Sequence, residues 1–174
     1  MKYRNASKGF TLIEMFFYIA ILIMLSLAVV QALIPLGRSF RTLSSNGSVN
    51  ATAQTALERM VREIRSATSV DLGNSTLASS PGVLQLNTLD SGGNATTVQF
   101  YVSGTSIRLK EAGVDVGPLS PPSARITSLI FRRITTSNSQ AIKIEMTVES
   151  GSGSAYITKN FYVTAVMRGS YPST

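Results

Sequence analysis

The spacing of apolar positions changes twice along the chain. From Met15 to Leu36, 22 residues carry no formal charge, and the apolar run is only mildly interrupted by Ser26, Gln31 and Pro35. At 1.5 Å per residue a helix of this length reaches about 33 Å, which matches the hydrocarbon core of a bilayer. The segment is therefore expected to span a membrane.

Beyond the span, apolar positions recur every three or four residues, as on one face of an amphipathic helix. The stripe consists of Ala53, Leu57, Met60, Val61, Ile64 and Ala67. Charged residues occupy the other face: Glu58, Arg59, Arg62, Glu63 and Arg65. Counted backwards, the same rhythm gives Asn50, Gly47, Leu43, Phe40 and Leu36. The pattern predicts one long helix, weakened near Pro35 to Gly37 and near Gly47, that ends near Val70 to Asn74.

The apolar period then becomes two, which predicts half-buried β-strands. The alternating positions are Leu84 and Leu86; Val98, Phe100 and Val102; Ile107 and Leu109; Ile142, Ile144, Met146 and Val148; and Ile157, Phe161, Val163, Ala165 and Met167. Glycine and serine clusters between these runs suit antiparallel hairpins. The stretch VGPLSPPSAR, residues 116–125, cannot be a central strand and predicts a surface loop.

These patterns predict an α+β protein. A long N-terminal helix, membrane-spanning in its first half and amphipathic in its second, is expected to pack on an antiparallel sheet of four to six strands. The expected divisions are a leader at 1–9, a transmembrane helix at 10–36, its amphipathic continuation at 37–70 and a β-rich globular head at 71–174.

Composition removes most catalytic chemistry. The chain contains no cysteine and no histidine, which excludes thiolate nucleophiles, disulfides, Cys/His zinc sites and the usual general base near neutral pH. The net charge is +7, but the first nine residues hold Lys2, Arg4 and Lys8, and 13 basic and 9 acidic residues remain without them. We therefore expect neither an enzyme nor a cofactor, and the positive charge says little about partners of the folded body.

A carboxylate, Glu14, lies at the beginning of the apolar run, within the motif KGFTLIE. Thr11 and Glu14 have the spacing of a capping box, and a carboxylate in the first turn is favoured by the helix dipole. A charge that enters the bilayer nevertheless costs on the order of 3 kcal/mol. Cleavage between Gly9 and Phe10 would place a new ammonium group one helical turn from Glu14, so that the two charges could neutralise each other within or between chains.

This motif, followed by an apolar helix, resembles the class III signal of type IV prepilins and type II secretion pseudopilins. The resemblance implies that a membrane-embedded prepilin peptidase cuts after Gly9 and methylates the amine of Phe10. It also implies that Glu14 pairs with the amine of a neighbouring subunit during assembly. The segments TALERMVREIRSATSV and KNFYVTAVMRG are similar to minor pilins and to J-like or W-like minor pseudopilins, and Glu14 argues against the tip pseudopilin that lacks this glutamate.

The resemblance implies a bacterial inner-membrane precursor that later enters a periplasmic or extracellular filament. Its expected partners are the prepilin peptidase, other pilin or pseudopilin subunits and the inner membrane. The cation bias of the flanks, with Arg38 and Arg41 following the span, favours a cytoplasmic N-terminus. Without cysteine, the chain cannot form the C-terminal disulfide loop of many pilins.

Other interpretations of the same residues remain. A conventional secretory signal, with Val30 and Ala32 as the small residues before the cut, would release a soluble ligand-binding β-domain. An uncleaved anchor would leave Glu14 without its amine. A nucleic-acid patch is not favoured, because few aromatic residues accompany its candidate cations, Arg62, Arg65, Arg132 and Arg133. No metal site is expected either, because the acidic residues Asp90, Glu111 and Asp115 are too dispersed for a calcium loop.

Overall fold

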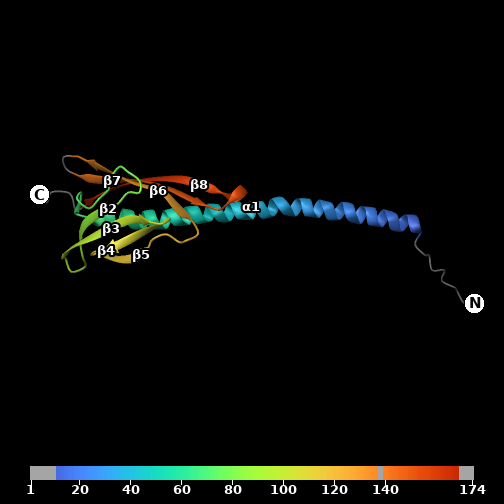
Figure 1. Ribbon diagram of the computed structural model, residues 1–174, viewed down its shortest axis with the longest axis horizontal. Coiled ribbons are helices and arrows are strands. Elements are labelled where there is room, and N and C mark those ends of the chain that lie inside the picture. The colour runs from blue at the N-terminus through green and yellow to red at the C-terminus, as the bar shows by residue number, and fades with distance from the viewer. Residues whose placement is uncertain (1–10, 137–138, 169–174) are drawn as a thin grey trace, which may run out of the picture. The chain divides into compact units, whose positions relative to one another are not determined.

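A computed structural model describes residues 11–136 and 139–168 of the chain. Figure 1 shows one helix followed by β-strands along the described chain. The elements are α1 (Leu12–Ser66), β1 (Ser69–Val70), β2 (Leu84–Leu89), β3 (Ala95–Ser103), β4 (Ser106–Glu111), β5 (Val114–Pro118), β6 (Arg125–Thr135), β7 (Gln140–Ser150), a 3₁₀ turn η1 (Gly153–Ala155) and β8 (Ile157–Val166). The predicted α+β class, with a long N-terminal helix on antiparallel strands, is confirmed.

The chain divides into two compact units, residues 1–40 and 41–174. In the first unit, the described residues belong to α1 apart from Thr11, and their large apolar side chains are exposed. This helix contains an 18-residue window with a mean hydropathy of 2.6, none of it buried. By length and composition α1 can therefore cross a membrane.

The prediction of a single helix is confirmed, since α1 continues through Pro35, Gly37 and Gly47. The helix ends at Ser66, four residues before Val70, the first position at which its end was expected. The amide of Ala67 still donates to the carbonyl of Glu63 at 3.0 Å, but the amide of Thr68 donates to the carbonyl of Asn87 at 2.9 Å. Pairing with β2 therefore replaces the helical hydrogen bonds at this point, a competition that local propensity does not reveal.

The buried face of α1 agrees with prediction at its C-terminal end and differs upstream. Ala53, Met60 and Ile64 are fully buried, as expected. The predicted extension through Asn50, Gly47 and Leu43 is wrong, because these residues are exposed and Ser45 and Val49 are buried instead. The buried residues of this part, Ser45, Val49, Thr52 and Ala53, therefore define a helix face that is rotated from the predicted one.

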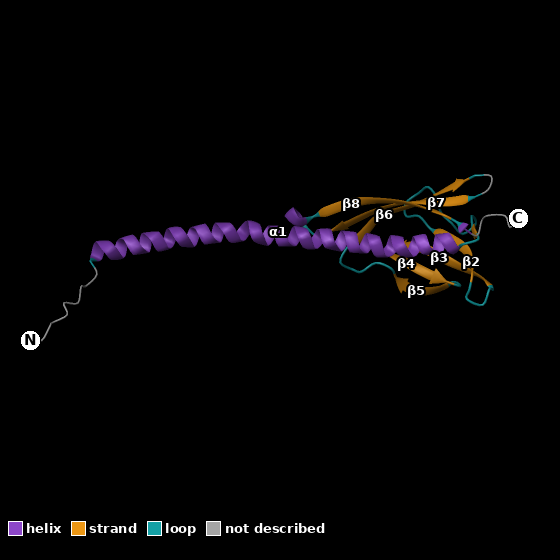
Figure 2. Cartoon of the chain, turned by 180° about the vertical axis from the view of Figure 1, so that it is seen from behind, coloured by secondary structure: helices purple, strands orange, loops and turns teal. Residues whose placement is uncertain are grey.

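The strands form two antiparallel sheets, one with the order β1-β2-β3-β4-β5 and one with the order β6-β7-β8. The expectation of one sheet with four to six strands is therefore wrong. In Figures 1 and 2, β6, β7 and β8 lie on one side of the C-terminal half of α1, and β2 to β5 lie on the other. Apolar alternation identified strands, but it carries no information on which strands pair.

The sequence patterns missed β1, β5 and β6. In β6 the pairing register shifts between Ile126 and Ser128, which interrupts the alternation of its buried residues Ile126, Leu129 and Phe131. β5 includes the first residues of the predicted 116–125 loop, and it is an edge strand, as the prolines require.

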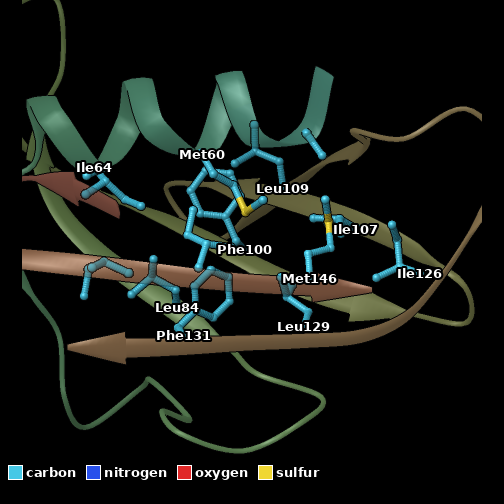
Figure 3. Close-up of a cluster of buried hydrophobic side chains, with 14 of the residues drawn as sticks. Met60, Ile64, Leu84, Phe100, Ile107, Leu109, Ile126, Leu129, Phe131 and Met146 are labelled. Atoms are coloured by element: carbon cyan, nitrogen blue, oxygen red, sulfur yellow. The ribbon is translucent and has the colours of Figure 1, made fainter. Parts of the chain in front are cut away.

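One hydrophobic core joins α1 to both sheets. Figure 3 shows Met60 and Ile64 of α1 beside Phe100 of β3, with Phe131 of β6 and Met146 of β7 in the same cluster. All five side chains are at most 1% exposed. Burial of such side chains is the main favourable contribution to folding, so the C-terminal part of α1 is an integral part of the head.

Backbone hydrogen bonds also connect segments outside the regular ladders. The amides of Ala78 and Gly82 donate to the carbonyls of Phe131 and Leu129, at 2.8 and 2.7 Å. These bonds cover part of the edge of β6 that faces away from β7, so that this edge is not left open for another strand.

Candidate functional site

The N-terminal turn of α1 contains the carboxylate that the sequence singled out. The side-chain oxygen of Thr11 accepts a hydrogen bond from the amide of Glu14 at 3.3 Å, and the carbonyl of Thr11 accepts one from the amide of Met15 at 3.2 Å. One of the two hydrogen bonds of the predicted capping box, from the amide of Glu14 to the side chain of Thr11, is thus present. The carboxylate of Glu14 accepts a hydrogen bond from the Tyr18 hydroxyl, with 3.3 Å between Oη and Oε1.

Tyr18 was missed by the sequence analysis, although its spacing gave a signal. It follows Glu14 by four residues, which places both side chains on one helix face. Gly9 and Phe10, the predicted processing residues, lie outside the described residues. The pairing of Glu14 with an amine on Phe10 therefore stays a prediction.

A continuous apolar surface follows this turn along α1. Phe16, Leu22 and Met24 are 69%, 64% and 76% exposed, and the other large apolar residues as far as Leu36 are also exposed. A surface of this kind is far larger than the scattered apolar residues of an ordinary soluble protein. Exposed apolar surface of this extent is typical of segments that contact lipid or other protein.

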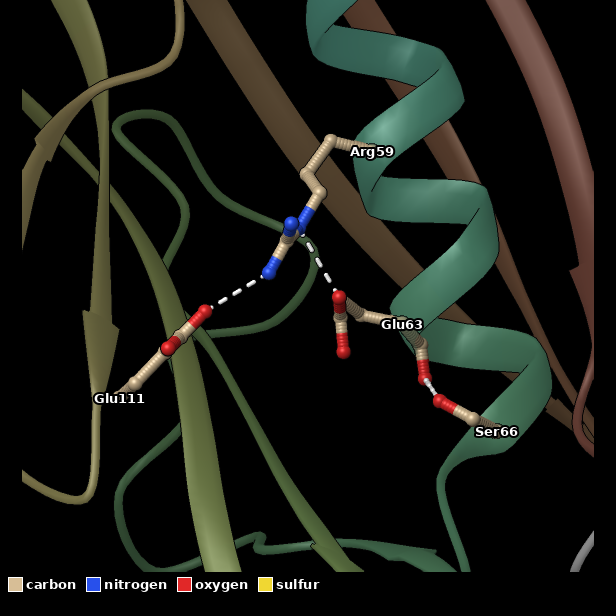
Figure 4. A network of polar contacts seen from close by, with 4 residues as sticks. All are labelled: Arg59, Glu63, Ser66 and Glu111. Carbon is tan, nitrogen blue, oxygen red and sulfur yellow. Dashed lines mark hydrogen bonds and ion pairs between the residues drawn. The ribbon is translucent and has the colours of Figure 1, made fainter. Parts of the chain in front are cut away.

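A second feature connects α1 to β4. As Figure 4 shows, the guanidinium of Arg59 lies between the carboxylates of Glu63 and Glu111, at 2.9 and 2.7 Å. The sequence placed Arg59 and Glu63 on a solvated helix face, and their spacing of four residues was visible there. The contact with Glu111, 52 residues away, is created only by the fold.

The three acidic residues weighed as a calcium site are engaged separately. Glu111 pairs with Arg59, whereas Asp115 accepts hydrogen bonds from Arg108 and Tyr101, both at 2.9 Å. The Arg108 guanidinium and the Tyr101 hydroxyl hold the pKa of Asp115 below its ordinary value. The described residues contain no cluster of three or more acidic side chains that could hold a metal ion.

Asp90 has a local structural role in the turn between β2 and β3. Its carboxylate accepts hydrogen bonds from the amides of Gly92 and Asn94, both at 2.8 Å. The hydrogen bonds from the backbone and side chain of Asn94 lower the pKa of Asp90. This carboxylate therefore stabilises the hairpin turn.

The four arginines considered as a nucleic-acid patch do not form one cluster. Arg62 and Arg65 line a groove of about 700 Å³ together with Arg168, which the sequence analysis did not single out. Arg132 instead pairs with Glu145 on the face of the second sheet, with 3.0 Å between Nε and Oε1. The adjacent residue Arg133 is exposed on the opposite face of β6.

Comparisons of the chain with protein-family models, with curated proteins and with solved structures each give no match. Any functional conclusion must therefore come from the residues themselves. The strongest evidence is the turn from Thr11 to Tyr18 and the exposed apolar helix that continues from it.

Proposed function

We propose that this chain is a minor subunit of a bacterial type IV pilus or type II secretion pseudopilus. It is cleaved after Gly9, methylated on the new amine of Phe10 and assembled into a filament. The observation that carries the proposal is a carboxylate, Glu14, in the first turn of a long apolar helix whose surface is exposed.

The energetics of Glu14 favour a cationic partner. A carboxylate costs on the order of 3 kcal/mol within a bilayer, and one neutral hydrogen bond contributes about 0.5–1.5 kcal/mol. The Tyr18 hydroxyl at 3.3 Å is therefore too weak a partner to offset the cost. An ammonium on Phe10, four residues before Glu14, supplies the missing charge, as does the amine of an adjacent subunit.

The apolar surface of α1 serves two states of the subunit in this proposal. Before assembly, lipid solvates the exposed side chains between Met15 and Leu36. In the filament, the same side chains pack against those of other subunits, which buries apolar area. Contacts between different faces of identical helices extend into a fibre when the rotation between subunits does not close into a ring, and the proposal requires this open arrangement.

The flanking charges set the proposed orientation. Lys2, Arg4 and Lys8 precede the span, and Arg38 and Arg41 follow it. The excess of cations before the span places the N-terminus in the cytoplasm and the head outside it. The prepilin peptidase and the inner membrane are the first partners, and other pilin or pseudopilin subunits are the later ones.

Mass spectrometry of the chain isolated from its native host tests the processing step. We expect a mature chain that begins at a methylated Phe10. A chain that begins near Leu33, as conventional signal cleavage would give, overturns the proposal and supports a secreted ligand-binding domain. Filaments containing chains that keep the first nine residues contradict it as well.

The variant Glu14→Ala tests the role of the carboxylate in assembly. Processing should continue, while the amount of the chain in sheared filaments should fall, because the amine loses its counter-charge. The matched control is Asp115→Ala, which removes an exposed carboxylate from the edge strand β5 of the head. An equal filament content in the two variants refutes the pairing role of Glu14.

A further inference from the structure

A groove in the second unit lies where the last turns of α1 meet the segment that follows β8. It has a volume of about 700 Å³ and is lined by Glu58, Val61, Arg62, Arg65, Ser66 and Arg168. Three of these six residues are arginines with exposed side chains. The end of α1 and a segment about a hundred residues later in the sequence therefore bring three guanidinium groups to one groove.

These arginines differ from most other cations of the head. The ion pairs among the described residues use Arg59, Arg108, Arg125, Arg132 and Lys143. Arg62, Arg65 and Arg168 make no ion pair within the described part of the chain. Glu58 lines the same groove, but its carboxylate accepts a hydrogen bond from Gln54 at 2.9 Å. Three guanidinium groups therefore share the groove with one carboxylate, which leaves it a net positive charge.

The helix dipole explains only part of this arrangement. A cation in the last turn of a helix is stabilised by the dipole, and this accounts for Arg65. Arg62 precedes the last turn, and Arg168 comes from a different segment. Their convergence with Arg65 therefore requires another explanation.

We propose that this groove binds an acidic segment of a different protein, with Arg62, Arg65 and Arg168 pairing with its carboxylates. Guanidinium groups suit this role because they bind carboxylates through two parallel hydrogen bonds. The proposal does not depend on the proposed filament function, since it concerns the head alone.

The lining favours a protein segment over a nucleic acid. Among the described lining residues there is no aromatic side chain on which a base could stack, as single-stranded nucleic-acid sites usually have. Val61 adds apolar surface, which suits a peptide that carries apolar as well as acidic side chains.

A second copy of this chain cannot supply the acidic segment. Residues 41–174 contain eight acidic side chains. Five of them already pair with cations: Glu63, Glu111, Asp115, Glu145 and Glu149. Of the other three, Glu58 lines the groove itself, and Asp71 and Asp90 accept hydrogen bonds in separate turns. No cluster of unpaired acids remains among the described residues of this unit, so the proposed partner is a protein of different sequence.

The test measures binding of a fluorescent peptide of glutamate and leucine to the full chain in uncharged detergent. We expect binding that weakens as salt rises. The variant R62E/R168E should bind about tenfold more weakly or worse, because two attractive charges become repulsive. The control R41E/R133E changes the net charge equally through exposed arginines outside the groove and should keep binding within about twofold.

Three results overturn the proposal. One is absence of peptide binding by the wild-type chain even at low salt. Another is equal weakening by the control variant, which would mean that only net charge matters. The third is tighter binding of a single-stranded oligonucleotide of equal charge, lost in R62E/R168E, which would make the groove a nucleic-acid site. Circular dichroism melting of both variants verifies that they are folded in each comparison.

Discussion

The hydroxyl of Tyr18 lies 3.3 Å from Oε1 of Glu14, one helical turn further along α1. The carboxylate therefore has a polar neighbour on its own helix, although the residues around it are apolar and exposed. This hydrogen bond orients the carboxylate along the helix surface. It leaves the negative charge unneutralised, since a neutral hydroxyl carries no counter-charge.

The variant Tyr18→Phe removes this hydrogen bond and keeps the aromatic ring. If the chain assembles as proposed, we expect its content in sheared filaments to fall a few-fold, since such a bond contributes about 0.5–1.5 kcal/mol. The decrease should be smaller than for Glu14→Ala, which removes the charge itself. Tyr162→Phe, on the face of the second sheet, is the control. A yield equal to wild type in Tyr18→Phe would show that the hydroxyl has no part in assembly.

Arg59 is expected to stabilise the attachment of α1 to β4. Its side chain is 34% exposed, so solvent screens its two ion pairs and each should contribute only about 0.2–1 kcal/mol. In a double-mutant cycle of Arg59→Met and Glu111→Gln, thermal unfolding in uncharged detergent should give a positive coupling energy within this range. Substituting Arg62→Met instead of Arg59→Met should give no coupling, because Arg62 has no ion pair with Glu111 in the structure.

Gly151 is expected to tolerate no side chain. Its φ is 82°, and a Cβ added there would collide with the backbone carbonyl of Ala155 and lie 2.5 Å from Oγ of Ser45 on α1. Gly151→Ala should lower the free energy of unfolding by about 1–3 kcal/mol through overpacking, in addition to backbone strain. Gly153 also has a positive φ, 55°, but nothing lies within 4 Å of its added Cβ. Gly153→Ala should therefore cost less, and equal melting temperatures of the two variants would contradict the close approach.

Glu145 should make the stability of the head depend on acidic pH. The ammonium of Lys143 and the guanidinium of Arg132 hold the pKa of Glu145 below its ordinary value. The folded pKa is thus lower than the unfolded one, so this contribution is present above the unfolded pKa and is lost as pH falls through the folded pKa.

The measurement for Glu145 is the melting temperature at neutral pH and at about pH 3. Glu145→Gln should reduce the difference between the two values. The control Glu58→Gln changes a carboxylate that has no ion pair in the described structure and should leave the difference close to that of wild type. An unchanged pH dependence in Glu145→Gln would mean that the pairing with Lys143 and Arg132 does not stabilise the fold.

Prediction from the sequence succeeded where the spacing of apolar residues within one helix or strand decides which side chains are buried. Ala53, Met60 and Ile64 lie on one helix face by their spacing, and Ile142, Ile144 and Met146 on one strand face by theirs. It failed where a neighbouring segment changed the local outcome. Ser45 is buried because the backbone of Gly151 approaches it, and β6 was missed because its ladder shifts register near Ile126.

The candidate site also combines contacts that the sequence could predict with contacts that only the fold creates. The spacing of Thr11, Glu14 and Tyr18 within one short segment could be read from the sequence, and the hydrogen bonds between them follow it. The ion pair of Arg59 with Glu111 and the meeting of Arg62 and Arg65 with Arg168 join segments far apart in the chain. No pattern within one segment could have predicted them.

The amino-acid sequence by itself determined the long helix, its apolar half and the carboxylate at its start, because helical periodicity and hydropathy act over neighbouring residues. The tertiary structure decided the division into two sheets, the end of α1 at Ser66 and the arginine-lined groove. These features depend on which distant backbones pair and which side chains share the core. Strand pairing and core burial are determined by the free energy of the whole fold, so they cannot be predicted from any single segment.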